Sequence, residues 1–204
     1  RVEIRIAVLT LEAGKFRKLS LVNWNEKTRR TDGVLLVGGN KFFVSRQTLS
    51  MQSNFFKKLF FGGANDTAHS EVELENVNAN DLTLLLNILH RMAPVTLHKA
   101  EILLELAHRF GCSMLLDDLE NILADEFSYE EDEEIILRNL CWSNKYGLHF
   151  LKHQYMSGDF TVETLTKMKR SKYWKDLDEA TARELVNALF KERQFEDDSE
   201  EEEK

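Results

Sequence analysis

The change of hydrophobic period at Ser45 constrains the fold of this chain more than any other feature of its sequence. Before Ser45, residues 34–44 (VLLVGGNKFFV) form two apolar stretches around residues 38–40, which tolerate positive φ angles. This pattern predicts two strands joined by a tight β-hairpin turn. After Ser45, apolar residues recur at helical spacing up to residues 62–63, a Gly-Gly stop. The chain must therefore combine a small sheet with helices, which indicates an α+β fold.

Further strand and helix signals lie on both sides of this region. Alternating apolar residues over 2–8 predict a half-buried strand, and the segment EVELENV, residues 71–77, predicts another short one. Asn80 and Asp81 are good capping residues for a helix. This helix should end before Pro94, the only proline of the chain.

The second half of the chain has a helix-period pattern that begins at Lys99 and contains an internal echo. The sequence LLELAHRFGCSMLL, residues 103–116, aligns with NLCWSNKYGLHFLK, residues 139–152, and the alignment pairs Gly111 with Gly147. Two copies are too few for a repeat array. We therefore expect two stacked helical hairpins.

Composition and charge exclude several classes of partner and location. The chain has 35 acidic and 27 basic residues and a formal net charge of −8, which disfavours binding to nucleic acid or to an anionic membrane. No apolar run approaches the roughly 20 residues of a membrane helix. Cys112 and Cys141 lie in apolar helical patterns, as buried thiols of a cytoplasmic or nuclear protein do. The acidic residues 196–204 are expected to be disordered.

The sequence contains no pattern that indicates catalysis, a metal or a cofactor. His149 and His153 are four residues apart, so one helix face could present both to zinc, but no third ligand has a suitable spacing. Surface histidines are the preferred interpretation. The carboxylates cluster in charged runs, which are typical of solvated faces and not of a tuned acid and base pair. We therefore expect a protein without enzymatic activity, metal or cofactor.

Residues 31–60, TDGVLLVGGNKFFVSRQTLSMQSNFFKKLF, resemble the opening of the BTB/POZ family. That pattern has an Asp before an apolar strand, a second strand with an aromatic residue, a basic residue, a Leu, and a Ser followed by an aromatic residue. The matching positions here are Asp32, Val34, Phe42, Val44, Arg46, Leu49, Ser53 and Phe56. The likeness continues through residues 71–89 to the LAHRFGC helix and covers about residues 31–123.

The flanking sequences narrow the resemblance and suggest a division of the chain. Residues 1–27 resemble the last strand of a MATH domain and its linker in the MATH-BTB proteins expanded in nematodes, and residues 143–157 resemble the helical extension that follows BTB in that group. The expected organisation runs in chain order: a strand resembling the end of a MATH domain (1–14), a linker or amino-terminal helix (15–30), a BTB/POZ domain (31–127), a helical extension (128–195) and an acidic tail (196–204).

The family resemblance implies a small sheet with surrounding helices and a protein-interaction function without catalysis. It implies a homodimer that recruits cullin-3 as the substrate adaptor of a ubiquitin ligase, while a domain outside this chain binds the substrate protein. The alternative is a self-associating scaffold or a transcriptional-regulator module without a role in a ligase.

Two sets of residues are expected to make these contacts. The dimer interface is expected to include four apolar residues of the segment before the hairpin, because they are too hydrophobic for a free linker. The resemblance adds a charged pair that should be partly buried beneath the dimer surface. The dimer residues are Leu19, Leu21, Val22, Trp24, Asp32 and Arg46. The cullin-binding residues are Ala64, Asn65, Asp66, Leu89 and His90.

The sequence departs from the family pattern at two places. Gln52 stands where the family often has Arg or Lys. The family's cullin-contacting loop has a large apolar residue two places before a Glu, and the nearest match here, Ala64 to Asp66, has smaller residues. The resemblance therefore predicts weak binding to cullin-3.

Overall fold

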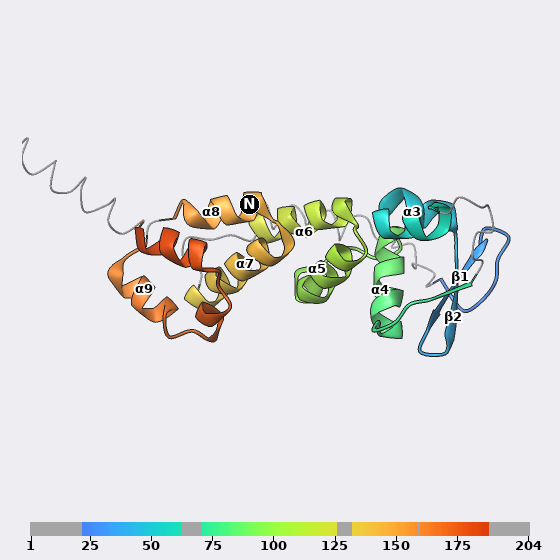
Figure 1. The fold of residues 1–204 in the computed structure, drawn as a ribbon, viewed down its shortest axis with the longest axis horizontal. Coiled ribbons are helices and arrows are strands. Elements are labelled where there is room, and N and C mark those ends of the chain that lie inside the picture. The colour runs from blue at the N-terminus through green and yellow to red at the C-terminus, as the bar shows by residue number, and fades with distance from the viewer. Residues whose placement is uncertain (1–21, 63–70, 126–131, 159, 188–204) are drawn as a thin grey trace, which may run out of the picture. The chain divides into compact units, whose positions relative to one another are not determined.

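The computed structural model describes residues 22–62, 71–125, 132–158 and 160–187 (Figure 1). The chain divides into two compact units, residues 1–95 and 96–204. The first unit contains the sheet with its helices, and the described part of the second is helical.

The sheet of the first unit has three described strands in the order β2-β1-β3. Strand β1 (Gly33–Val37) pairs antiparallel with β2 (Asn40–Val44) and parallel with β3 (Glu71–Glu73). Gly38 and Gly39 form the two-residue turn with φ angles of 54° and 79°. A tight turn of this kind needs positive φ at both positions, and the predicted hairpin is confirmed.

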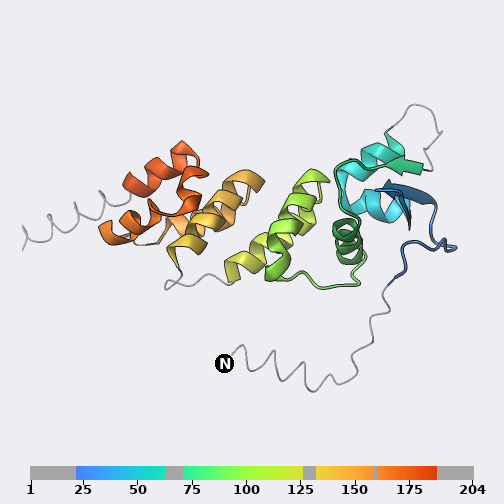
Figure 2. The ribbon, with the colours of Figure 1, turned by 90° about the horizontal axis from the view of Figure 1, so that it is seen from below.

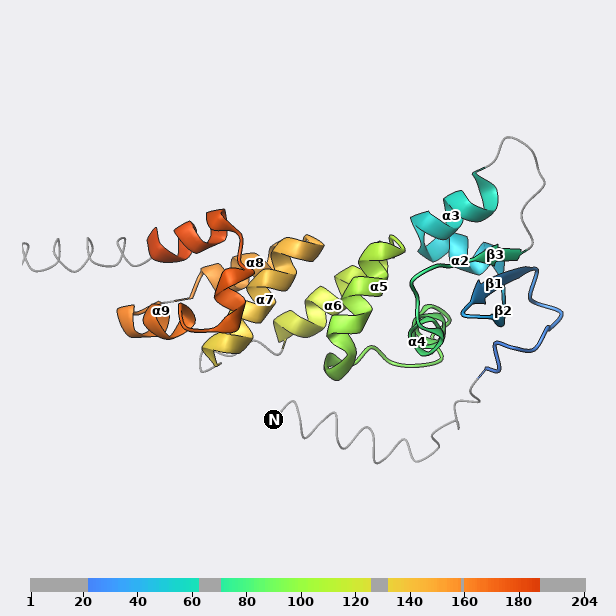
Figure 3. The same cartoon turned by 60° about the horizontal axis from the view of Figure 1, so that its bottom comes forward.

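Three helices surround this sheet (Figure 3). They are α2 (Arg46–Gln52), α3 (Asn54–Phe61) and α4 (Ala79–Leu89). One face of each helix and of strands β1 and β2 is buried, in line with the alternation of the strands and the helical spacing of the leucines and phenylalanines. The core of this unit includes Leu35, Val37, Phe42, Val44, Leu49, Phe56, Phe60, Leu82, Leu85 and Leu86.

Two helix boundaries differ from the sequence prediction. The single helical pattern after Ser45 is two helices, because Ser53 has an extended backbone and its Oγ accepts a hydrogen bond from the backbone N–H of Phe56 at 3.0 Å. Helix α4 begins earlier than expected, since Asn78 and not Asn80 or Asp81 is its N-cap. In both cases a short polar side chain satisfies a free N–H of the first turn.

The described part of the second unit is helical (Figure 2). After the 3₁₀ turn η1 (Leu97–Lys99) come α5 (Ala100–Arg109), α6 (Ser113–Asp125), α7 (Glu133–Tyr146), α8 (His149–Met156), α9 (Val162–Met168) and the 3₁₀ turn η2 (Lys172–Lys175). Residues 179–187 are also helical.

The internal echo corresponds to two helical hairpins with the same turn. Gly111 and Gly147 have φ angles of 59° and 72°, which a glycine adopts readily after the end of a helix. The residue after each glycine, Cys112 or Leu148, donates its N–H to a carbonyl five residues back, at 2.8 and 2.9 Å. The helix pairs α5 with α6 and α7 with α8 therefore share one turn geometry, as the alignment predicts.

A buried polar contact joins the helices of the second hairpin. Asn139 of α7 donates from Nδ2 to the hydroxyl oxygen of Tyr155 in α8, at 2.7 Å, and both side chains are almost fully buried. Buried polar groups need such partners because an unpaired one loses its hydration without compensation.

Several expectations concern residues outside the described ranges or differ from what is found. The strand over 2–8 and the acidic tail 196–204 lie outside the described residues. Of the expected linker or amino-terminal helix, residues 22–30 are described and form turns and bends, with no helix among them. Cys112 is buried as expected, whereas Cys141 is only partly so.

Candidate partner-binding site

Trp24 fixes the segment that precedes β1 onto α4. Its indole Nε1 donates a hydrogen bond to Oδ1 of Asn87 at 2.9 Å, and its carbonyl accepts one from the N–H of Phe43 at 2.7 Å. The ring also packs against His90, with 4.7 Å between the ring centroids. Only 6% of the surface of Trp24 is exposed, so residues of its own chain bury the ring.

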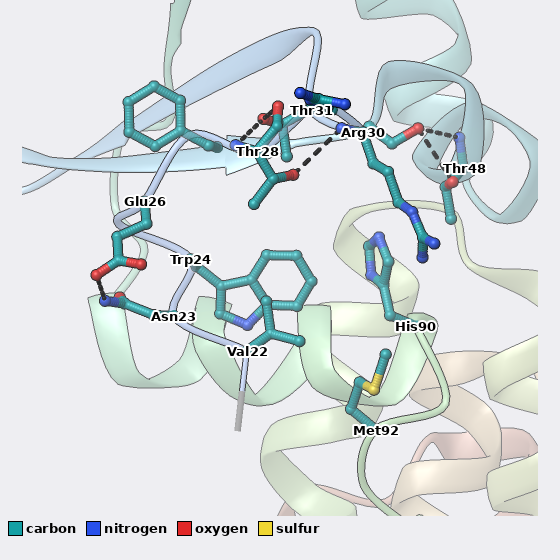
Figure 4. Close-up of a pocket in the computed structure, with 13 residues that line it drawn as sticks. Val22, Asn23, Trp24, Glu26, Thr28, Arg30, Thr31, Thr48, His90 and Met92 are labelled. Atoms are coloured by element: carbon teal, nitrogen blue, oxygen red, sulfur yellow. Dashed lines mark hydrogen bonds between the residues drawn. The ribbon is translucent and has the colours of Figure 1, made fainter. Parts of the chain in front are cut away.

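The loop that follows Trp24 is held by two threonine side chains. The N–H of Thr28 donates to Oγ1 of Thr31 at 3.0 Å, and the N–H of Arg30 donates to Oγ1 of Thr28 at 3.3 Å. These local bonds compete with regular structure and favour a turn. The turn leaves Arg29 and Arg30 exposed, and Figure 4 shows Arg30 extending toward His90.

A cavity of about 560 Å³ lies between this loop, β2, the start of α2 and the end of α4 (Figure 4). Its wall combines aromatic and aliphatic side chains with hydroxyl groups and two arginines, a mixture typical of binding pockets. The lining residues are Val22, Asn23, Trp24, Glu26, Thr28, Arg29, Arg30, Thr31, Phe43, Ser45, Thr48, His90 and Met92.

His90 is a titratable group that lines this cavity. Burial lowers the pKa of its imidazole, and a 2.9 Å hydrogen bond between Nδ1 and the carbonyl of Leu86 partly offsets the shift. The ring therefore favours the neutral form, with Nδ1 as the donor to Leu86. Trp24 and His90 were expected on two different surfaces, and the structure brings them together.

Asp32 and Arg46 form the expected ion pair, but on a partly exposed surface. Nε of Arg46 lies 3.2 Å from Oδ2 of Asp32, and the backbone N–H of Arg46 donates to Oδ1 at 2.8 Å. The side chain of Arg46 is 22% exposed and that of Asp32 is 51% exposed. Within this chain, Asp32 is thus half exposed and also binds the first N–H of α2.

The departure at Gln52 has a structural role. Its Nε2 donates to the carbonyl of Leu89 at 2.7 Å, which ties the end of α2 to the end of α4. Leu89 itself is 5% exposed. The side chain of Leu89 thus lies in the core of the first unit, and its expected contact with cullin-3 stays a prediction.

An exposed apolar surface on α2 and α3 was not among the expected site residues. Met51 is 76% exposed, Phe61 is 56% exposed and Phe55 is 37% exposed. The guanidinium of Arg46 lies over the ring of Phe61 at 5.8 Å. The doubled aromatics at 55–56 and 60–61 were the available signal, since neighbouring helical residues cannot all face one core.

Some of the residues expected to contact partners lie outside the described ranges, and the two histidines considered as zinc ligands are exposed. Leu19, Leu21 and Ala64 to Asp66 lie outside the described residues. His149 and His153 are exposed, and the described residues contain no group of three or more potential ligands that could hold a metal. Within those residues, no helix has the length and apolar character that crossing a bilayer requires.

Comparisons with known proteins match most of the region described above. The model of the BTB/POZ domain family matches residues 21–126. BTB and MATH domain-containing protein 38 of Caenorhabditis elegans is 26% identical over 167 residues, which are 81% of this chain and 42% of that protein. Proteins 36 and 15 of the same series and organism are 25% and 30% identical, over 80% and 67% of this chain and 50% and 49% of their own lengths. The chain thus spans about half the length of these curated relatives.

Proposed function

The chain belongs to the BTB/POZ domain family, and from this premise we propose that it acts as a homodimeric substrate adaptor of a cullin-3 ubiquitin ligase. Proteins of this family are generally non-enzymatic interaction modules, so the coarser function, protein binding, follows from membership itself. In the adaptor role, the protein would bind the cullin-3 scaffold and bring a substrate protein to it, in the cytoplasm or the nucleus.

One observation carries this proposal: relatives that match about 80% of this chain are named for a BTB domain together with a MATH domain. A second domain beside a self-associating module suits a protein that joins two partners. In this proposal the substrate protein binds through a domain outside this chain.

The exposed surface of α2 and α3 supports the self-association part of the proposal. Met51, Phe55 and Phe61 are large apolar side chains exposed on α2 and α3, and exposed apolar surface is typical of interaction sites. Asp32 and Arg46 lie at the start of α2, next to this surface. Leu19 and Leu21 would contribute from the preceding segment.

The cullin-3 contact is proposed to be weak because its loop has small residues. Ala64 would fill a cullin pocket less completely than the larger residue usual in the family, and Asp66 is shorter than the usual Glu. Burying a Met side chain in place of Ala contributes on the order of 1 to 2 kcal/mol. This free energy corresponds to roughly a tenfold change in affinity.

Calorimetry with the amino-terminal half of cullin-3 tests this proposal. The double variant Ala64→Met with Asp66→Glu should bind roughly tenfold more tightly than the natural chain. His90→Ala should weaken binding, whereas the control His98→Ala, at an exposed position of the second unit, should not. Leu89→Ala should also weaken binding, and because Leu89 is a core residue, urea denaturation of this variant separates a lost contact from lost stability.

Two results would contradict the proposal in different ways. Tight binding by the natural chain with no response to the loop variants would show that the loop assignment is wrong. Absence of binding by every variant, with the dimer intact, would instead favour a self-associating scaffold or a transcriptional-regulator module.

A further inference from the structure

A strongly basic segment lies near the end of this acidic chain. Residues 167–175 contain four lysines and one arginine and no carboxylate, although the chain as a whole has a net charge of −8. The cations are Lys167, Lys169, Arg170, Lys172 and Lys175. Tyr173 and Trp174 stand among them.

Buried residues of α9 and a hydrogen bond from α7 hold this segment in place. It follows the last turn of α9, whose Leu165 and Met168 are buried, and it includes η2. Sγ of Cys141 in α7 donates to the carbonyl of Tyr173 at 3.5 Å. Figure 1 shows α9 in orange, with the segment continuing from its end.

Four of the five cations have no carboxylate partner in the described part of the second unit. Lys167 pairs with Glu133 at 3.3 Å and Glu163 at 3.4 Å, while no ion pair is found there for the other four. Lys169 and Lys172 instead lie over the rings of Trp174 and Tyr173, at 6.0 and 4.8 Å. We define the basic surface as Lys169, Arg170, Lys172 and Lys175, all of them exposed.

Asp176 directly follows Lys175 and adds one exposed carboxylate beside this surface, whereas the next three carboxylates in the chain have partners elsewhere. Asp178 accepts hydrogen bonds from the side chain of Asn144 and from the N–H of Thr181. Glu179 pairs with Arg183 at 2.6 Å, and Glu184 pairs with Lys152 at 3.6 Å. A helix C-terminus favours a cation such as Lys169, but Lys172 and Lys175 lie beyond α9, so the helix dipole does not account for them.

We propose that the basic surface binds the acidic segment 196–203 of the same chain. That segment, EDDSEEEE, has seven carboxylates, which complement the four cations. A tethered segment competes at an effective concentration in the millimolar range, which favours it over an acidic segment free in solution. The acidic segment thereby covers the basic surface and restricts it to partners acidic enough to displace it.

Chain length permits this contact. The helical residues 179–187 begin shortly after η2 and span about 13 Å. The eight residues 188–195 can extend by at most about 28 Å. The acidic segment can therefore return to the basic surface of its own unit.

Zero-length carbodiimide cross-linking of the full chain, read by mass spectrometry, tests this contact. The reagent joins amines to carboxylates that touch, so Lys169, Lys172 and Lys175 should link to residues 196–203 several times more often than the exposed control residues Lys57 and Lys58. The yield should not change on dilution. It should fall in about 1 M salt, where the screening length shortens to about 3 Å.

Matched charge reversals separate this surface from a general effect of charge. The variant Lys172→Glu with Lys175→Glu should release the acidic segment and lower cross-linking at Lys169. The variant Lys57→Glu with Lys58→Glu, which changes net charge equally in the first unit, should leave it unchanged. Circular dichroism that matches the natural chain shows that both variants are folded.

Three outcomes would overturn the proposal. Equal linking to all exposed lysines would show that the acidic segment has no preferred site. Links that disappear on dilution would assign the surface to the acidic segment of a second copy. A full-length variant with the seven carboxylates replaced by amides, if it bound a single-stranded oligonucleotide but not a synthetic peptide of residues 195–204, would assign the surface to nucleic acid.

Discussion

At the scale of single residues, Asp32 shows how one side chain can serve two local needs. Its carboxylate accepts the first N–H of α2 and also pairs with the guanidinium of Arg46. The family resemblance placed this pair correctly. It could not give the exposure of Asp32, because exposure depends on the turns over residues 22–31, whose path the sequence does not fix.

Replacing Asp32 tests the strength of these contacts. Asp32→Ala should lower the free energy of unfolding by about 1 to 2 kcal/mol, because it removes a capping acceptor and a partly exposed ion pair. Asp32→Asn keeps an acceptor and should lose less than about 1 kcal/mol. Urea denaturation measures both. A loss of about 3 to 5 kcal/mol for Asp32→Ala would instead indicate a fully buried pair, as a tight dimer surface over it would produce.

His90 makes stability depend on pH in a defined direction. Its pKa is lowered in the folded chain, so the unfolded chain takes up the proton first as pH falls below about 6.5. The contribution of His90 is therefore complete above that pH and declines as pH falls toward the folded pKa. Urea denaturation at about pH 7.5, 6.5 and 5.5 should show this decline.

The variants of this test are His90→Gln and, as a control, His149→Gln. The first should flatten the decline, whereas the second changes an exposed residue and should preserve it. Identical pH slopes for His90→Gln and the natural chain would show that another group causes the decline.

At the scale of elements, the sequence predicted the features that depend on residues close together in the chain. Two glycines between apolar stretches specified the hairpin, and the aligned Gly111 and Gly147 specified two similar helix turns. The break at Ser53 was missed because apolar spacing continues across it, and only the cap geometry separates α2 from α3. The contact of Trp24 with Asn87 was missed because it joins residues 63 positions apart, which periodicity does not report.

The hydrogen bond between α7 and α8 gives a prediction at this scale. Tyr155→Phe removes the hydroxyl that accepts a hydrogen bond from the buried Asn139 amide. The variant should lower the free energy of unfolding by about 1 to 3 kcal/mol, because a buried amide without a partner is not hydrated by water. The control Tyr173→Phe alters a partly exposed tyrosine in the same unit and should cost under about 0.5 kcal/mol. Urea denaturation compares the two, and equal losses would contradict the role given to this bond.

At the scale of the whole molecule, the family followed from the sequence, whereas the candidate cavity did not. Its walls come from the loop, β2, α2 and α4, and residues from two separately expected surfaces meet in it. A family resemblance indicates which residues occupy matching positions in the fold. The pairing of Trp24 with His90 depends on how this loop packs on this helix.

Self-association is the prediction that belongs to the whole molecule. The chain has a mass of 23.8 kDa, and light scattering at micromolar concentration should give twice that mass. A specific dimer needs about 800 Å² from each partner. The double variant Leu19→Asp with Leu21→Asp should yield the monomer, whereas Phe150→Asp, at an exposed position of the second unit, should remain dimeric. A clean monomer mass for the natural chain would contradict the homodimer.

The order of the three strands also bears on aggregation. Strands β2 and β3 flank β1, so each leaves one row of backbone groups without a strand beside it in the described sheet. Such rows can recruit strands from misfolded chains. Here Lys41 and Glu71 form a 3.0 Å ion pair between the two flanking strands, and Glu73 adds a further exposed charge on β3. A further strand added along β2 or β3 would bury these charged side chains, and this cost disfavours strand-to-strand stacking of copies when heat loosens the fold.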